Sequence, residues 1–133
     1  MARLDGAHAM FEKTYQEALG LTREARDYVA FQERRDQSSL VPLDQLTASC
    51  ESMRVTARLT QVMAWLLVQK AVHQGEMTRE QAADPELRLA GQHICGVSNQ
   101  QVNETLPPRL RDLLERSHQL YRRIERLDAL MDA

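Results

Sequence analysis

Cysteine is scarce in this sequence, with only Cys50 and Cys95 among 133 residues. Two cysteines do not make the disulfide framework that stabilises small secreted domains, so we expect a pair of reduced thiols. The N-terminal stretch MARLDGAHAMFEK also lacks the continuous apolar core of a secretory signal, because Asp5 and Glu12 interrupt it. Both absences predict a cytoplasmic protein.

The sequence also lacks an apolar run long enough to cross a bilayer. Its most apolar segment, Cys50–Val72, is free of charge only from Leu59 to Gln69 and includes two glutamines there. A membrane-spanning helix needs about 20 predominantly apolar residues, and a central Arg or Lys is costly. We therefore predict no membrane partner.

No excess of one charge is present, since 17 basic residues stand against 19 acidic ones for a net charge of −2. Nucleic-acid-binding domains concentrate uncompensated Lys and Arg on one face. The arginines near the C-terminus are interleaved with acids at helical spacing, as in Arg111 with Glu115 and Asp112 with Arg116, which favours pairing within a helix. We expect no nucleic-acid partner.

Apolar residues recur at alternating steps of three and four, which indicates amphipathic helices at about 9–35, 44–74 and 107–131. A capping-box pattern at Thr78 and Gln81 predicts a short helix over 78–83. Residues 84–105 have no clear period and read as a long connection. The sequence predicts an all-α, antiparallel three-helix bundle with a short extra helix and a long loop, in a single domain over 1–133.

The helix predicted over 44–74 is apolar on two opposite sides. One stripe includes Leu46, Met53 and Leu67. We interpret the opposite stripe as a twofold dimer interface, because a second apolar face on one bundle would otherwise be wet. Its members are Val55, Leu59, Val62 and Leu66. The alternative is that this helix is simply the most buried element of one bundle.

A polar strip lies between the two apolar stripes, and the single tryptophan belongs to it. Trp and Arg are enriched in binding hot spots, so we interpret the strip as a partner-binding surface, together with the irregular loop from Arg88 to Val97. The predicted contact residues are Glu51, Arg54, Arg58, Gln61, Trp65 and Arg88. A tryptophan that packs at the bundle edge is the alternative.

Motifs for catalysis are missing. The sequence has no nucleophile elbow and no glycine-rich phosphate loop, so we predict no enzyme, no catalytic residues and no cofactor. His93 and Cys95, with His73, His118 and Cys50 on other segments, do not form the paired motifs of a zinc site, and we predict no metal. A histidine phosphotransfer bundle remains an alternative, with His118 as the acceptor.

Two strings of the sequence resemble a known family. ESMRVTARLTQVMAWLLVQKAVHQGEMT, Glu51 to Thr78, closely resembles the segment typical of the alphaproteobacterial family named after RcdA, the regulator of CtrA degradation. LPPRLRDLLERSHQLYRRIERLD, Leu106 to Asp128, is similar to the last helix of that family. The resemblance implies an all-helical, three-helix homodimer that acts as an adaptor.

The resemblance also implies partners. The family's name-giving member helps to deliver substrates, among them a cell-cycle transcription factor, to the ClpXP protease, together with a response-regulator-like factor and a cyclic-di-GMP-binding effector. The expected function is thus a non-enzymatic adaptor for regulated, cell-cycle-linked proteolysis, and the alternative is an uncharacterised helical scaffold. Since the sequence stops at Ala133 after the last predicted helix, we expect no flexible C-terminal tail.

Overall fold

The computed structural model describes residues 2–96 and 104–132, with side chains described from residue 9 onward. Regular structure in these residues is entirely helical, which confirms the all-α prediction. The elements are α1 (Ala2–Phe31), α2 (Glu33–Gln37), α3 (Pro42–His73), α4 (Arg79–Ala82), the 3₁₀ helix η1 (Pro85–Leu87), α5 (Gln92–Cys95) and α6 (Pro108–Leu130). No helix in this part of the chain is both long and apolar enough to span a membrane.

The helix boundaries follow local sequence signals. Pro42 occupies the first turn of α3, where a missing N–H costs nothing. The helix ends before Gly75, whose φ of 76° lets the Glu76 N–H donate to the Ala71 carbonyl at 2.9 Å. The capping box predicted at Thr78 is present and starts α4. The helix predicted over 9–35 is divided at Gln32 into α1 and α2.

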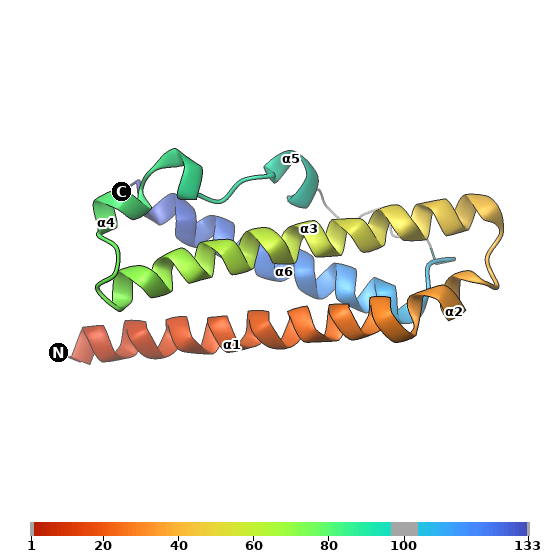
Figure 1. Cartoon of the computed structure of the whole chain (residues 1–133), viewed down its shortest axis with the longest axis horizontal. Helices are drawn as coiled ribbons and strands as arrows, with labels where there is room; N and C mark the ends of the chain where they lie inside the picture. Colours follow the sequence, from red (N-terminus) through yellow and green to blue (C-terminus); the bar gives the residue numbers. More distant parts are fainter. Residues whose placement is uncertain (1, 97–103, 133) are drawn as a thin grey trace.

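The three long helices α1, α3 and α6 form the bundle (Figure 1). Helix α1 runs antiparallel to both of the others, but α3 and α6 run parallel to each other. The antiparallel order that the sequence predicted therefore holds for α1 with each neighbour and not for the α3–α6 pair. A parallel pair obliges the chain to return along the whole bundle before α6 can begin.

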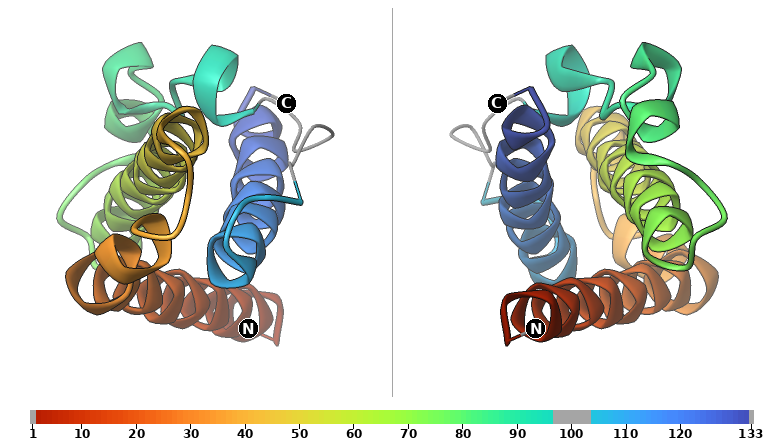
Figure 2. Two further views of the ribbon diagram at one scale, coloured as in Figure 1. Left: turned by 90° about the vertical axis from the view of Figure 1, so that its right-hand side faces the viewer. Right: turned by 90° about the vertical axis from the view of Figure 1, so that its left-hand side faces the viewer.

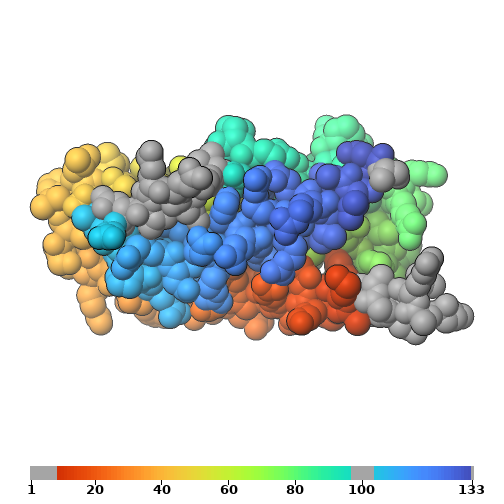
Figure 3. All heavy atoms as spheres, turned by 180° about the vertical axis from the view of Figure 1, so that it is seen from behind, coloured from red at the N-terminus to blue at the C-terminus, as the bar shows by residue number. Residues whose placement is uncertain are grey.

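The segment that makes this return, here called the crossover, extends from residue 74 to residue 107. Viewed from the ends of the bundle, the crossover helices α4, η1 and α5 lie on one side of α3 and α6, and α1 lies on the other (Figure 2). From behind, α6 runs along the molecule between α1 and the crossover (Figure 3). The predicted loop over 84–105 thus contains η1 and α5, while its residues 97–103 lie outside the described part.

One face of each long helix packs into the core. Helix α6 contributes Leu110, Leu113, Leu114, Leu120, Tyr121 and Ile124, and α1 contributes Ala18, Leu21, Ala25 and Tyr28. From α3, the buried face carries the four side chains that we had interpreted as a dimer interface: Val55, Leu59, Val62 and Leu66, each no more than 3% exposed. That interpretation was wrong, because these side chains pack inside a single chain against α1 and α6.

Candidate interaction surfaces

The three long helices create three grooves. One groove is bridged by ion pairs, one is covered by the crossover and one is open. Between α1 and α6, charged side chains form bridges: Arg116 binds Glu24, and Arg123 binds Glu17 at 2.7 Å. The hydrogen bond from Arg116 holds the pKa of the Glu24 carboxyl below its ordinary value. These four side chains are about 35–47% exposed, so each bridge contributes little to the free energy of folding.

The groove between α3 and α6 is covered by the crossover and contains a buried arginine. Arg58 is 0% exposed. Its Nε donates to the Cys95 carbonyl at 2.9 Å, and its Nη1 donates to the Leu114 carbonyl at 2.9 Å and to the Ser117 hydroxyl at 3.3 Å. Burial lowers the pKa of Arg58 to about 10, so the guanidinium stays charged at neutral pH.

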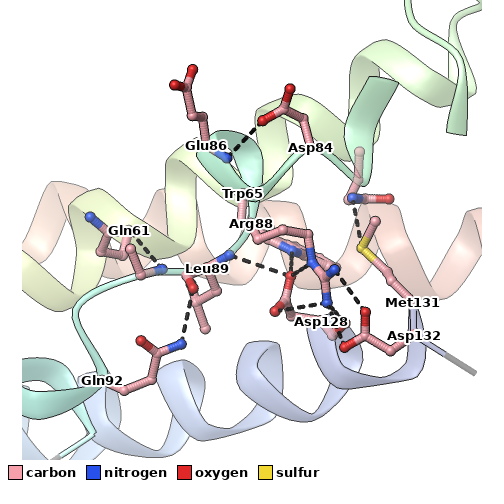
Figure 4. Close-up of polar contacts among 12 residues, drawn as sticks. Gln61, Trp65, Asp84, Glu86, Arg88, Leu89, Gln92, Asp128, Met131 and Asp132 are labelled. Atoms are coloured by element: carbon pink, nitrogen blue, oxygen red, sulfur yellow. Dashed lines mark hydrogen bonds and ion pairs between the residues drawn. The ribbon is translucent and has the colours of Figure 1, made fainter. Parts of the chain in front are cut away.

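A second polar cluster fixes the crossover near the end of α6 (Figure 4). The Asp128 carboxylate accepts hydrogen bonds from Trp65 Nε1 at 2.9 Å, from Arg88 Nε at 2.8 Å and from the Leu89 N–H at 3.3 Å. Arg88 also pairs with Asp132 at 2.9 Å. One carboxylate therefore joins α3, the crossover and α6.

Backbone groups of the crossover find further partners on the helices beneath it. The Tyr121 hydroxyl donates to the Ala90 carbonyl at 2.8 Å, and Gln61 Oε1 accepts from the Ala90 N–H at 3.2 Å. Because this part of the crossover has little regular structure, its polar groups would otherwise lie unpaired against the bundle. Side chains of α3 and α6 satisfy them.

The predicted partner-binding strip is largely used within the chain. Arg58 and Trp65 are buried, and Arg88 and Gln61 hold the crossover, so these four are not available to a partner in this conformation. Glu51 and Arg54 are partly exposed and pair with each other at 3.4 Å. The α3 residues of this strip form a polar helix face, and the segment that this face contacts belongs to the same chain.

The groove between α1 and α3 is open. It has a volume of about 690 Å³, and apart from one arginine its lining consists of apolar residues and threonines. Thr22, Ala25 and Val29 form the α1 side, and Thr60, Ala64 and Leu67 form the α3 side. Arg26 is the charged residue of the lining. No bridging ion pair or covering segment among the described residues closes this groove.

The outward face of α3 also exposes apolar side chains. Leu46 is 61% exposed, Met53 71% and Leu67 50%. We interpreted the opposite stripe as a dimer interface, but the structure buries that stripe and exposes this one. The existence of two apolar stripes could be predicted from spacing, but the sequence does not say which stripe meets α1 and α6.

Known proteins provide a comparison for this architecture. A family model described as "Protein of unknown function (DUF1465)" matches residues 5–133. The chain belongs to this family. A solved structure, that of RcdA from Caulobacter crescentus CB15, is similar to it, with 37% sequence identity and a TM-score of 0.74, over 91% of this chain and 89% of RcdA. The resemblance to the RcdA family is thereby confirmed, whereas no curated protein sequence matches the chain.

Histidines and cysteines of this DUF1465 chain are dispersed. Cys50 is exposed on α3 and Cys95 is buried on α5. Within the described residues, no group of three or more His, Cys, Asp and Glu side chains could hold a metal ion. His118 is partly buried, with its Nε2 atom shielded from solvent and unpaired, and burial together with the charge of Arg58 lowers its pKa.

Proposed function

We propose that this chain is a non-enzymatic adaptor that tethers substrates or regulatory proteins to the ClpXP protease in the cytoplasm. The observation that carries the proposal is the likeness to RcdA over nine tenths of both chains. Holding a substrate beside an unfoldase raises its effective concentration without new chemistry. A rigid bundle with an open apolar groove suits that task, because it offers a preformed surface to a protein.

We further propose that the chain acts as a homodimer through the first half of α3. The predicted interface residues are in the core, so another surface is required. Leu43, Leu46, Cys50 and Met53 follow the three-four spacing of one helical face, and all four are exposed. A contiguous apolar stripe on a helix is a typical protein interface, whereas isolated exposed apolar residues are ordinary.

The adaptor proposal is tested by following protein lifetimes in the source organism. Cells with and without the gene are compared for protein half-lives, and the same is done after depletion of ClpX. We expect a small set of proteins that live longer in both cases, and we expect purified ClpX to be retained by the purified tagged chain or by the chain with a response-regulator-like factor. No shared set of proteins and no retention would refute the proposal.

The dimer proposal has a matched pair of variants. Met53 and Met10 have the same exposure, 71%, so Met53→Glu and Met10→Glu place the same charge on the surface in different positions. We expect Met53→Glu to halve the solution mass and Met10→Glu to leave it unchanged. Light scattering measures both. A wild-type monomer would rule out the dimer.

A histidine phosphotransfer function is less consistent with the geometry. A phosphoacceptor imidazole must reach the active site of another protein, and the Nε2 atom of His118 is shielded from solvent. An uncharacterised scaffold remains the alternative to an adaptor. The two are separated by protein half-lives, which a scaffold would leave unchanged.

A further inference from the structure

We propose that the open groove between α1 and α3 binds an amphipathic helix of another protein. The helix would be about three turns long, with aliphatic side chains on the face that enters the groove and acidic side chains on the edge beside α1. This inference deepens the adaptor function proposed above by naming the kind of segment that the chain recognises. It rests on the hydrogen bonding, the dimensions and the charge of the groove.

Hydrogen bonding disfavours an extended segment. The three hydroxyls of the lining already donate to their own helices: Thr22 to the Ala18 carbonyl at 2.7 Å, Thr56 to the Ser52 carbonyl at 3.3 Å and Thr60 to the Thr56 carbonyl at 2.8 Å. No hydroxyl proton therefore remains for the carbonyls of an extended chain, which would be buried unpaired at a cost. A helix satisfies its own backbone and avoids that cost.

The dimensions fit a short helix with aliphatic side chains. The α3 side of the groove extends from Thr56 to Leu67, which corresponds to roughly 17 Å at 1.5 Å per residue, or about three helical turns. Ala25 on α1 and Ala64 on α3 leave room for Leu or Ile side chains of the bound helix. Packing of an apolar helical face into such a groove is a common mode of peptide recognition.

Charge orients the bound helix. The α3 lining carries no charged residue, whereas Arg26 lines the groove on the α1 side and Arg23 lies one turn before it, also exposed. Arg26 pairs with the neighbouring Asp27 at 3.1 Å, but both side chains are more than half exposed, so this pair contributes little and the guanidinium can take another carboxylate. Acidic side chains would thus favour the edge beside α1.

The test uses the purified full-length chain and designed 14-residue peptides labelled with fluorescein. The first peptide has Leu at three-four spacing with Glu along one edge. The second replaces two central residues with Pro to prevent a helix, and the third replaces each Glu with Lys. Fluorescence anisotropy gives the dissociation constants. We expect the first peptide to bind at least about tenfold more tightly than either of the others.

Variants of the chain locate the binding. Ala64 and Ala129 are both exposed alanines on helices, so Ala64→Arg blocks the groove and Ala129→Arg is its matched control. We expect Ala64→Arg to weaken binding of the Glu peptide at least about tenfold and Ala129→Arg to leave it unchanged. Arg26→Glu should reverse the preference between the Glu and Lys peptides.

Several results would overturn the inference. These are no saturable binding at millimolar peptide, equal binding of the Pro peptide, or equal binding by the Ala64→Arg variant. Loss of a wild-type dimer in Ala64→Arg would also overturn it, because a second copy would then fill the groove. The adaptor proposal is judged separately by ClpX retention and protein half-lives, so a peptide result leaves it unaffected.

Discussion

The two grooves beside α3 are built from the same helix but have opposite chemistry. Toward α6 the helix presents Arg58, whose Nε donates to the Cys95 carbonyl of the crossover, and Trp65, whose Nε1 donates to the Asp128 carboxylate that also anchors the crossover. Toward α1 it presents Thr60, Ala64 and Leu67, which bind no other segment described in this chain. Polar side chains on the covered face of α3 thus coincide with the irregular segment that packs there. The face toward α1 is uncharged, its hydroxyls are already hydrogen-bonded within the helices, and no other described segment covers it.

Two leucines of α3 sharpen this comparison most strongly. Leu59 is 3% exposed and Leu67 is 50% exposed. Leu59→Ala should lower the free energy of unfolding by about 3 kcal/mol, because it leaves a cavity in the core, and Leu67→Ala should change it by less than about 0.5 kcal/mol. Urea unfolding measures both. Equal effects would show that Leu67 is buried in solution, as it would be beneath a second copy of the chain.

Two arginines test the covered groove in the same way. Arg58→Ala removes the hydrogen bonds that the guanidinium donates to the Cys95 and Leu114 carbonyls, although the Leu114 carbonyl keeps the Ser117 hydroxyl as a donor. We expect a loss of about 3 kcal/mol, since hydrogen bonds that involve a charged group contribute about 1.5–3 kcal/mol. Arg54 lies one turn earlier on α3, and its side chain is partly exposed. Arg54→Ala should therefore lower the free energy of unfolding by less than about 0.5 kcal/mol. A loss below 1 kcal/mol for Arg58→Ala would mean that the crossover is not held by this side chain.

The helices could be predicted because their signals are local. On α6 the three-four stripe is buried from Leu110 through Leu113, Ser117 and Leu120 to Ile124, as its spacing indicates, while Leu127 at its end is 37% exposed. The division of the first helix at Gln32 was missed, since no proline or glycine marks it. Periodicity defines how many apolar faces a helix has, and it defines the packing only where a single face exists.

The parallel order of α3 and α6 could not be predicted from periodicity, yet one signal pointed toward it. The connection over residues 84–105 is longer than the turn that joins two adjacent antiparallel helices. The polar strip containing Arg58 and Trp65 has the same three-four spacing as an apolar stripe, so it covers one helix face. Taken together, a long irregular connection and a polar helix face predict a segment that packs back onto the bundle.

A substitution at Asp128 should loosen the crossover where it contacts the end of α6. Asp128→Ala removes the acceptor for Trp65, Arg88 and the Leu89 N–H. We expect a loss of about 2 kcal/mol, because hydrogen bonds to charged groups contribute about 1.5–3 kcal/mol when buried. Hydrogen exchange at the Ala90 amide should also accelerate. Asp132→Ala is the control, since the Asp132 carboxylate is exposed and pairs with the same Arg88. Similar exchange in both variants would contradict a central role for Asp128.

The smallest expected effect concerns the bridged groove between α1 and α6. Because Arg116 lowers the pKa of Glu24 in the folded state, the carboxylate stabilises the fold above its ordinary pKa near 4.5, and this contribution is lost as pH falls through the lower folded value. Glu24→Gln should therefore cost up to about 1 kcal/mol at pH 7 and progressively less toward pH 3. Urea unfolding at both pH values measures the difference, with the exposed Glu80→Gln as control. If the cost of Glu24→Gln were the same at pH 3, the charge of Glu24 would not be its cause, and the Arg116–Glu24 bridge would contribute nothing to holding α1 against α6.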